Sequence, residues 1–225
     1  MLLLAAVFVL FLSYLIGSIP SGLLIVKFST GKDIRQVESG RTGGTNAMRA
    51  GGFWAGLGTA VLDILKSAST VWLARWLINL GWLPDNPWLV MLAPIFAILG
   101  HNYSVFLAER TQDGKLRLRG GAGGAPAVGG AFGLWPPSLV ITVVIGALLL
   151  FGVGYASLAT LSVGIVSALI FAYRAWLGAS PWEYVFYGLI AFALLAWALR
   201  PNIKRLLNGT ERLVGWRARQ KTNPK

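Results

Sequence analysis

The chain alternates between long apolar stretches and short polar stretches that are rich in Gly, Lys and Arg. The long apolar stretches lie at residues 2–26, 53–80, 88–107, 138–173 and 184–199. A helix needs about 20 apolar residues to cross a bilayer, so each stretch predicts a membrane-spanning helix. The stretch 138–173 is too long for one crossing and is interrupted by glycines near residues 152–157, which predicts two helices there. The pattern therefore predicts six spanning helices.

Basic residues divide the polar stretches into two sets. Lys and Arg gather in residues 27–51, in residues 108–122 and in the tail from Arg200, whereas residues 81–87 and 134–138 contain none. Cytoplasmic segments of membrane proteins collect Lys and Arg. We therefore place all three basic segments on the cytoplasmic side.

This placement constrains the number of crossings. An even number must separate residues 108–122 from the tail, but the long apolar stretches supply three. Residues 121–135 (GAGGAPAVGGAFGLW) are the candidate for the missing crossing, and we expect them inside the bundle because small residues let helices approach closely. The predicted fold is an all-α integral membrane protein with seven transmembrane helices, its amino terminus outside and its carboxyl terminus in the cytoplasm.

The composition agrees with a membrane protein. Hydrophobic residues make up 56% of the chain and charged residues 12%, against about 25% charged residues in soluble domains. The net charge of +12 would suggest nucleic acid in a soluble protein, but cytoplasmic loops facing anionic headgroups explain it here, so we expect no nucleic-acid partner. With no Cys and one His, the chain offers no disulfide and no cluster of Cys or His ligands, and we expect neither metal nor cofactor.

The opening MLLLAAVFVLFLSYLIG lacks a positive n-region and a clear cleavage site, which predicts a retained helix rather than a signal peptide.

The polar segment ESGRTGGTNAMRAGG, residues 38–52, is unusual in so apolar a chain. Glycines let backbone N–H groups approach an anion, and Arg side chains match phosphate oxygens. We interpret this segment as a phosphate site at the membrane surface; the alternative is an ordinary cytoplasmic turn whose arginines only set the topology. The candidate phosphate ligands in and next to it are Arg35, Arg41, Gly43, Gly44, Thr45, Asn46 and Arg49, and Ser39 adds a neutral donor.

Polar groups in two further places are expected near the same membrane face. His101 ends the third apolar stretch, and Gly120, Gly121 and Gly123 precede the predicted short helix, whose N-terminus would attract an anion. Helix packing explains these glycines equally well, and a histidine at a helix end is more often structural than catalytic.

Asp63, Lys66 and Arg75 are the ionisable residues inside the second apolar stretch. Asp63 and Lys66 are three residues apart, which leaves two interpretations open: a structural ion pair, or a phosphate contact made by Lys66. In the tail, residues 202–211 read alone as a basic interfacial segment, in which Glu211 is the one acid.

Four motifs resemble those of the bacterial acyl-phosphate:glycerol-3-phosphate acyltransferases, in the same order and over residues 17–211. The motifs are SIPSGLLIVKFSTGKDIRQVESGRTGGTNAMRAGG at 18–52, LDILKS at 62–67, GHNYSVFL followed by GGAGGAPAVGG at 100–130, and NIKRLLNGTE at 202–211. The family also has seven helices and a cytoplasmic carboxyl terminus, which the count of crossings reaches independently.

The resemblance implies a reaction in which an acyl phosphate donates its fatty acyl group to the 1-hydroxyl of glycerol 3-phosphate, without metal or cofactor. It implies a site at the cytoplasmic face of a bacterial inner membrane, formed by a domain at residues 1–211, with a basic tail at residues 212–225. The residues to which it assigns catalytic roles are Ser39, His101, Asn202 and Glu211. The residues expected to bind substrate phosphate are Arg35, Arg41, Gly43, Gly44, Thr45, Asn46, Arg49, Lys66, Gly120, Gly121 and Gly123.

The chain departs from the family pattern at four positions. Glu38 stands where the family has Gly and Arg41 where it has Asn; Ala122 stands where it has Lys, and Pro126 where it has Thr. We hypothesise that Arg41 compensates for the missing lysine. Two alternatives to the enzyme remain: a non-catalytic membrane protein that binds phosphorylated lipids, and a transporter of an organic phosphate.

Overall fold

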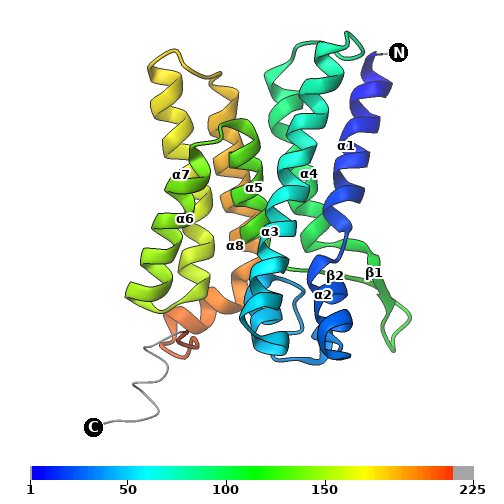
Figure 1. Ribbon diagram of the computed structural model, residues 1–225, viewed down its shortest axis with the longest axis vertical. Coiled ribbons are helices and arrows are strands. Elements are labelled where there is room, and N and C mark those ends of the chain that lie inside the picture. The colour runs from blue at the N-terminus through cyan, green and yellow to red at the C-terminus, as the bar shows by residue number, and fades with distance from the viewer. Residues whose placement is uncertain (1, 215–225) are drawn as a thin grey trace.

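A computed structural model describes residues 2–214 as a bundle of helices, with a β-hairpin at one end (Figure 1). Most of the predicted basic tail, residues 212–225, therefore lies outside the described residues. The helices and strands are α1 (Leu2–Ser18), α2 (Ser21–Thr30), η1 (Ile34–Gln36), α3 (Gly44–Asn79), α4 (Pro87–Asn102), β1 (Ser104–Arg110), β2 (Leu116–Arg119), α5 (Gly124–Leu134), α6 (Ser138–Leu148), η2 (Leu149–Val153), α7 (Ala156–Trp176) and α8 (Glu183–Leu207).

The expected helix over residues 2–26 is in fact two helices. The chain leaves α1 at Ile19 and Pro20, and α2 begins at Ser21. Proline has no N–H group to continue the hydrogen bonds of α1, so carbonyls at the break need other partners. The hydroxyl of Ser104 donates to the Ser18 carbonyl at 2.6 Å, and Lys66 Nζ donates to the Ile19 carbonyl at 2.9 Å. The break thus ties α1 to two distant parts of the chain.

Helix α3 begins earlier than its apolar stretch. The sequence predicts a loop over residues 38–52, but α3 starts at Gly44 and bends at Gly52, whose φ is 83°. Glycine adopts that angle without steric cost, so the bend needs glycine at this position. Residues 44–51, in the second half of the predicted loop, are therefore helical. This helical segment begins directly after the part of the loop that remains.

The expected helix over residues 88–107 is too long. Helix α4 ends at Asn102, and residues 104–119 form an antiparallel hairpin of β1 and β2, which the predicted all-α fold did not include. The signal for the hairpin is Asp113-Gly114, a tight-turn dipeptide in which Gly114 has a φ of 75°. Val105 and Phe106 are apolar but exposed, so their hydropathy prolonged the predicted helix without marking a buried segment.

The short helix predicted within residues 121–135 is present and buried. A Cβ atom at Gly129 of α5 would lie 2.0 Å from the Ile64 carbonyl oxygen, and one at Gly130 would lie 2.4 Å from the Tyr187 hydroxyl. Only glycine at these two positions lets α5 pack this closely against α3 and α8. Arg75 of α3 donates to the carbonyls of Gly133 and Leu134, each at 2.9 Å, and so satisfies the last turn of α5.

The break expected near residues 152–157 is confirmed, because η2 ends at Val153 and α7 begins at Ala156. Among the described residues, the segments Leu3–Thr30, Gly44–Asn79, Ala156–Trp176 and Glu183–Leu207 are long and apolar enough to cross a membrane. Two shorter apolar helices, Pro87–Asn102 and Ser138–Val153, accompany them.

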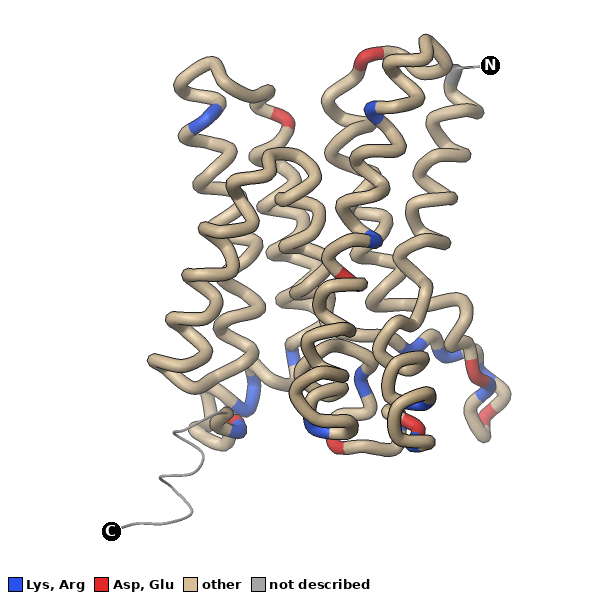
Figure 2. Tube along the Cα trace, viewed as in Figure 1, with Lys and Arg blue, Asp and Glu red and all other residues tan. Residues whose placement is uncertain are grey.

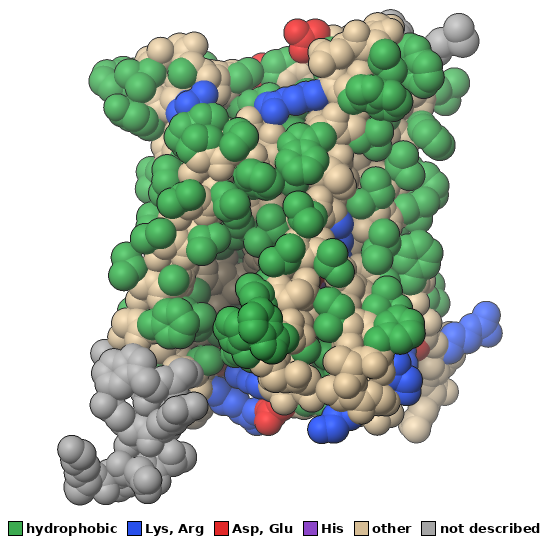
Figure 3. Space-filling model, in the orientation of Figure 1, with side chains coloured by type: hydrophobic (Ala, Val, Ile, Leu, Met, Phe, Trp, Pro, Cys, Tyr) green, Lys and Arg blue, Asp and Glu red, His purple; other side chains and the backbone are tan. Residues whose placement is uncertain are grey.

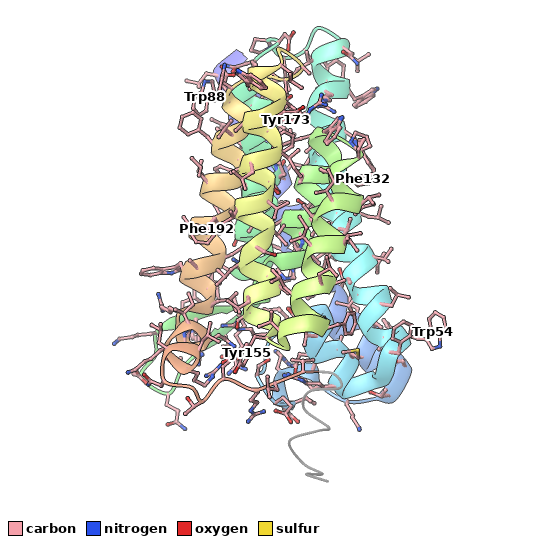
Figure 4. All side chains as sticks on the ribbon, turned by 90° about the vertical axis from the view of Figure 1, so that its left-hand side faces the viewer. Trp54, Trp88, Phe132, Tyr155, Tyr173 and Phe192 are labelled. Carbon is pink, nitrogen blue, oxygen red and sulfur yellow. The ribbon has the colours of Figure 1, made fainter. Side chains whose placement is uncertain are left out.

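The surface follows the pattern of a membrane protein. Basic residues gather at the end of the bundle that carries the hairpin (Figure 2), and apolar side chains cover the middle band (Figure 3). Trp54 and Tyr155 lie toward the basic end, and Trp88 and Tyr173 lie near the other end (Figure 4). Tryptophan and tyrosine prefer the two membrane–water interfaces, so these side chains mark both edges of the apolar band.

Candidate functional site

A cavity of about 500 Å³ opens near the basic end of the bundle, between α3, α5, α7 and the end of α8. Its size is in the range of small-molecule sites. Of the predicted site residues, those that line it are Ser39, Arg41, Gly43, Gly44, Thr45, Asn46, Arg49, His101, Gly123, Asn202 and Glu211. Residues far apart in the sequence thus meet in one place. We call this space the first cavity.

A second cavity of about 570 Å³ lies beside the first, next to the hairpin. Of the predicted site residues, Arg35, Gly120 and Gly121 line the second cavity, and Lys66 lines neither cavity. Five residues line both cavities and form the wall between them: Glu38, Ser39, Arg41, Asn202 and Arg205.

The segment between α2 and α3, residues 31–43, forms the first loop of the site. The side-chain amide of Asn46 holds this loop in shape. Its Nδ2 atom donates to the carbonyls of Ile34, Val37 and Arg41 at 3.2, 3.0 and 2.8 Å, and its side chain is buried. Asn46 lines the first cavity, but its hydrogen-bond donors already serve the loop. The structure shows that the Asn46 side chain stabilises the first loop. A contact between Asn46 and phosphate stays a prediction.

The N-terminus of α3 opens into the first cavity. Gly43 is the N-cap residue and provides no side chain to cap the helix, and a Cβ atom at this position would meet no atom within 4 Å. The first N–H groups of a helix have no partner inside the helix and carry a partial positive charge. Arg49 lines the same cavity from the next turn of α3. This arrangement suits an anion.

Residues 120–124, which we call the second glycine segment, contact the first loop directly. The N–H of Thr42 donates to the Gly120 carbonyl at 3.3 Å, and the N–H of Gly121 donates to the His101 carbonyl at 2.9 Å. Gly123, with a φ of 90°, is the N-cap of α5 and lines the first cavity. The two polar segments that the sequence analysis expected near the same membrane face are therefore in contact.

Asp63, Lys66 and His101 form a buried network at the wall of the first cavity, which Asp63 and His101 line and Lys66 does not. Lys66 Nζ lies 2.7 Å from Asp63 Oδ1, 3.0 Å from His101 Nδ1 and 2.9 Å from the Ile19 carbonyl oxygen. Lys66 Nζ thus makes hydrogen-bond contacts with His101 and the Ile19 carbonyl and an ion pair with Asp63. Of the two interpretations that the sequence left open for Lys66, the structure shows the ion pair, and a phosphate contact stays a prediction.

This network defines the state of the His101 ring. Nδ1 lies 3.0 Å from Lys66 Nζ and 3.5 Å from Asp63 Oδ1. Because an ammonium group can only donate and Lys66 is the nearer partner, we infer that Nδ1 accepts its proton and that the ring proton lies on Nε2. Nε2 lies against the second glycine segment, because a Cβ atom at Gly121 would be 1.9 Å from it. His101 therefore presents an N–H donor on the side of the glycines.

Arg35 and Arg41 have different surroundings. Arg35 forms a 2.6 Å ion pair with Asp33; this hydrogen bond holds the pKa of the Asp33 carboxyl below its usual value and raises the pKa of Arg35. Arg41 instead donates to the Ala198 carbonyl at 2.6 Å. Burial lowers the pKa of Arg41, and the positive charge of Arg205 lowers it further. Arg41 is thus a desolvated cation in the wall between the two cavities.

The segment after α8 contributes Glu211, Arg212 and Val214 to the lining of the first cavity. Asn202 donates to Glu211 at 2.8 Å, and Arg205 pairs with the same carboxylate at 3.0 Å. Arg212 pairs with Glu38 of the first loop and lines the first cavity, so the described start of the predicted tail takes part in the site. The boundary predicted at residue 211 stays a prediction.

Sequence reasoning missed several polar side chains at these cavities, among them Ser157, Thr160 and Asn102. Ser157 and Thr160, from the first turns of α7, line the first cavity, and Asn102 lines the second. The buried hydroxyl of Ser157 and both polar atoms of the Asn102 side chain have no hydrogen-bond partner among the described residues. The spacing of three residues places Ser157 and Thr160 on one helix face, which was a usable signal. Nothing in the sequence distinguished Asn102 from other helix-end asparagines.

The bundle, its apolar band and the cavities at its basic end define an integral membrane protein with a site rich in arginine and backbone amides. A family model described as "Glycerol-3-phosphate acyltransferase" matches residues 7–209. The chain belongs to this family.

Individual relatives agree over nearly the full length. A glycerol-3-phosphate acyltransferase of Thermus thermophilus is 39% identical over 214 residues, which are 95% of this chain and 98% of that protein. Glycerol-3-phosphate acyltransferase 2 of Moorella thermoacetica is 35% identical over 209 residues, 93% of this chain and 97% of that protein. A crystal structure of PlsY, described as an integral membrane glycerol 3-phosphate acyltransferase in its glycerol 3-phosphate form, superposes with a TM-score of 0.77 at 30% identity, over 94% of this chain and 96% of that one.

Proposed function

We propose that this chain transfers a fatty acyl group from an acyl phosphate to the 1-hydroxyl of glycerol 3-phosphate, releasing 1-acylglycerol 3-phosphate and inorganic phosphate. Family membership supports the glycerol 3-phosphate acceptor, and a related structure is described as the lysophosphatidic acid form, which corresponds to the product. The observation that carries the proposal is the meeting of two amide-rich helix starts, at Gly43 and Gly123, in one arginine-lined cavity.

The lining of the first cavity suits an acyl phosphate as the donor. Met48, Phe53 and Leu57 give it apolar lining, and the glycines and arginines give it polar lining. An acyl chain has an apolar wall beside it, and its phosphate has amide and guanidinium donors. Such positioning and charge stabilisation are the means by which the site would accelerate transfer, because phosphate is already a good leaving group.

The assigned tautomer of His101 indicates its role in this reaction. A general base needs an unprotonated atom facing the substrate, but Nδ1 faces Lys66 and Nε2 carries the proton. We assign His101 the role of a hydrogen-bond donor. The hydroxyl attacks the acyl carbonyl carbon, the bond from that carbon to the phosphate oxygen breaks, and the hydroxyl proton passes to a phosphate oxygen.

An acyl-transfer assay tests the proposed function. Purified full-length protein is incubated with palmitoyl phosphate and labelled glycerol 3-phosphate, and the lipid product is measured; we expect labelled 1-acylglycerol 3-phosphate and one phosphate per acyl group. Palmitoyl coenzyme A in place of palmitoyl phosphate is the donor control. Binding of both substrates without transfer would favour a non-catalytic lipid-binding protein, and uptake of glycerol 3-phosphate into proteoliposomes would favour a transporter.

We propose seven crossings, an external amino terminus, and a cytoplasmic site in a bacterial inner membrane. The start of α1 and the end of α8 lie at opposite ends of the bundle, which supports an odd number of crossings (Figure 1). The chain has no cysteine, so single cysteines report the side of each loop without further changes. An impermeant thiol reagent added to whole cells should label Asp85→Cys, between α3 and α4, but should label Asp113→Cys, in the hairpin, only after lysis. The reverse pattern would contradict this orientation.

A further inference from the structure

The second cavity is more strongly basic than the first. The arginines that line it are Arg35, Arg41, Arg117, Arg119, Arg200 and Arg205. Among the described residues that line it, Glu38 is the one carboxylate. Like charges confined to one cavity repel each other and attract anions from solution. The charge of this cavity therefore calls for an anionic ligand.

Pairing within the protein neutralises only part of this charge. Arg117 of β2 and Arg200 of α8 are exposed and have no carboxylate partner in the part of the chain that the structure describes. The guanidinium of Arg200 lies 4.1 Å from the ring centroid of Trp197, and this stacking leaves the N–H groups at its edge available. The hairpin and α8 thus each hold an unpaired cation at the second cavity.

Asn102 is an independent sign of a ligand. Its side chain lines the second cavity and is 5% exposed, and neither its Oδ1 nor its Nδ2 atom has a hydrogen-bond partner among the described residues. Buried polar groups in native proteins nearly always have partners, so an unpaired amide at a cavity wall indicates that a ligand or water completes it. An amide N–H group can donate to a phosphate oxygen.

We propose that the second cavity is a separate binding site for a soluble phosphate monoester dianion, and that it holds glycerol 3-phosphate before the acyl transfer; this inference rests on the proposed function. The cavity lacks the apolar wall that Met48, Phe53 and Leu57 give the first, so it suits a ligand without an acyl chain. Arg41 and Asn202 line both cavities, so these two residues are placed to contact a phosphate group in either one. Inorganic phosphate, the other product, shares this chemistry.

Direct binding to the full-length protein in detergent tests the proposal without depending on turnover. Calorimetric titrations use glycerol 3-phosphate and inorganic phosphate as separate ligands. The double variant Arg117→Gln/Arg200→Gln should weaken glycerol 3-phosphate binding by about tenfold, because two exposed cations are lost. The control Arg110→Gln removes an exposed arginine of the same hairpin that lines neither cavity, and it should bind like the wild type. Equal binding by the double variant and the wild type would overturn the proposal.

The two ligands distinguish a waiting site for substrate from an exit for product. Tighter binding of glycerol 3-phosphate than of inorganic phosphate, with both weakened in the double variant, supports the waiting site; tighter binding of inorganic phosphate overturns it. Asn102→Asp, which places a carboxylate where the unpaired amide lies, should weaken both ligands at least as much as the double variant does.

Kinetics connects the second cavity to the reaction. In the double variant, KM for glycerol 3-phosphate should rise by about tenfold while kcat stays within about twofold, and kcat/KM should depend less on salt than in the wild type. A fall in kcat with an unchanged KM contradicts the proposal. Failure of the proposed function appears differently, as absence of acyl transfer in the wild type while the difference in binding between wild type and double variant remains.

Discussion

Replacing Arg41 by Asn tests the hypothesis that this arginine supplies the positive charge of the lysine that the family resemblance leads us to expect at the position of Ala122. Both residues line the first cavity. The guanidinium of Arg41 is held by a 2.6 Å hydrogen bond to the Ala198 carbonyl and has no carboxylate partner among the described residues. Its charge is thus available to a substrate phosphate, and Asn at this position restores the residue that the family pattern carries.

The expected magnitude follows from the partial burial of Arg41. Loss of one partner of a buried charge pair costs about 2–5 kcal/mol, which corresponds to a decrease of about 30- to 5,000-fold in kcat/KM. An exposed arginine would cost less than about 1 kcal/mol, or about fivefold. The structure therefore predicts at least a 30-fold loss for Arg41→Asn, whereas the control Arg110→Asn, on the exposed hairpin surface, should stay within about twofold of the wild type.

The assay is the transfer of palmitate from palmitoyl phosphate to glycerol 3-phosphate, with thermal unfolding measured on each variant to exclude misfolding. Ala122→Lys should raise activity, and the double variant Arg41→Asn/Ala122→Lys should recover most of the loss, because one cation replaces the other in the same cavity. If Arg41→Asn keeps nearly full activity, or if the two substitutions add without coupling, the compensation hypothesis is wrong.

Three further predictions concern the network, the glycines and pH. Selective ¹⁵N-histidine NMR should show one signal pair with the proton on Nε2 of His101, and Lys66→Met should shift the proton toward a mixture of both nitrogens; protonated Nδ1 in the wild type contradicts the assignment. Gly121→Ala should destabilise the fold by about 1–3 kcal/mol in thermal unfolding, because its Cβ atom would lie 1.9 Å from the histidine ring, whereas Gly152→Ala, with no atom within 4 Å, should not. Asp33→Asn should lower stability at neutral pH, and its difference from the wild type should vanish as pH falls well below 3.8, because the pKa of Asp33 is lowered by its ion pair; a difference that persists at lower pH contradicts this account.

Hydropathy and charge could predict the elements that cross the apolar band but not where each one ends. The short buried helix α5 was predicted because the basic segments must lie on the same side of the membrane, which requires one more crossing. Its hydropathy alone was too low to indicate a helix that crosses the membrane. The hairpin was missed because Val105 and Phe106 are as apolar as a spanning helix, and apolar residues beside a membrane are not always inside one. The break at Pro20 was also missed, although proline there was visible in the sequence.

For the site, residue types identified the ligands better than their individual roles. Gly43 and Arg41 were expected to bind phosphate and Asn202 was expected to be catalytic, and all three line the first cavity. Asn46 was expected to face the ligand, but its amide holds three loop carbonyls, and Lys66 holds His101. Side-chain roles such as these depend on which acceptors the fold brings within hydrogen-bond distance, and sequence spacing does not encode that.

The sequence by itself determined the membrane environment, the basic end of the bundle and the family, because hydropathy, charge bias and ordered motifs are properties of residues along the chain. Only the tertiary structure decided that two cavities lie side by side, that Arg41 and Asn202 separate them, and that Asn102 is left without a partner among the described residues. The reason is physical: a cavity and an unpaired buried group exist only after distant helices have packed, and their packing is set by contacts such as that of Gly129 with the Ile64 carbonyl.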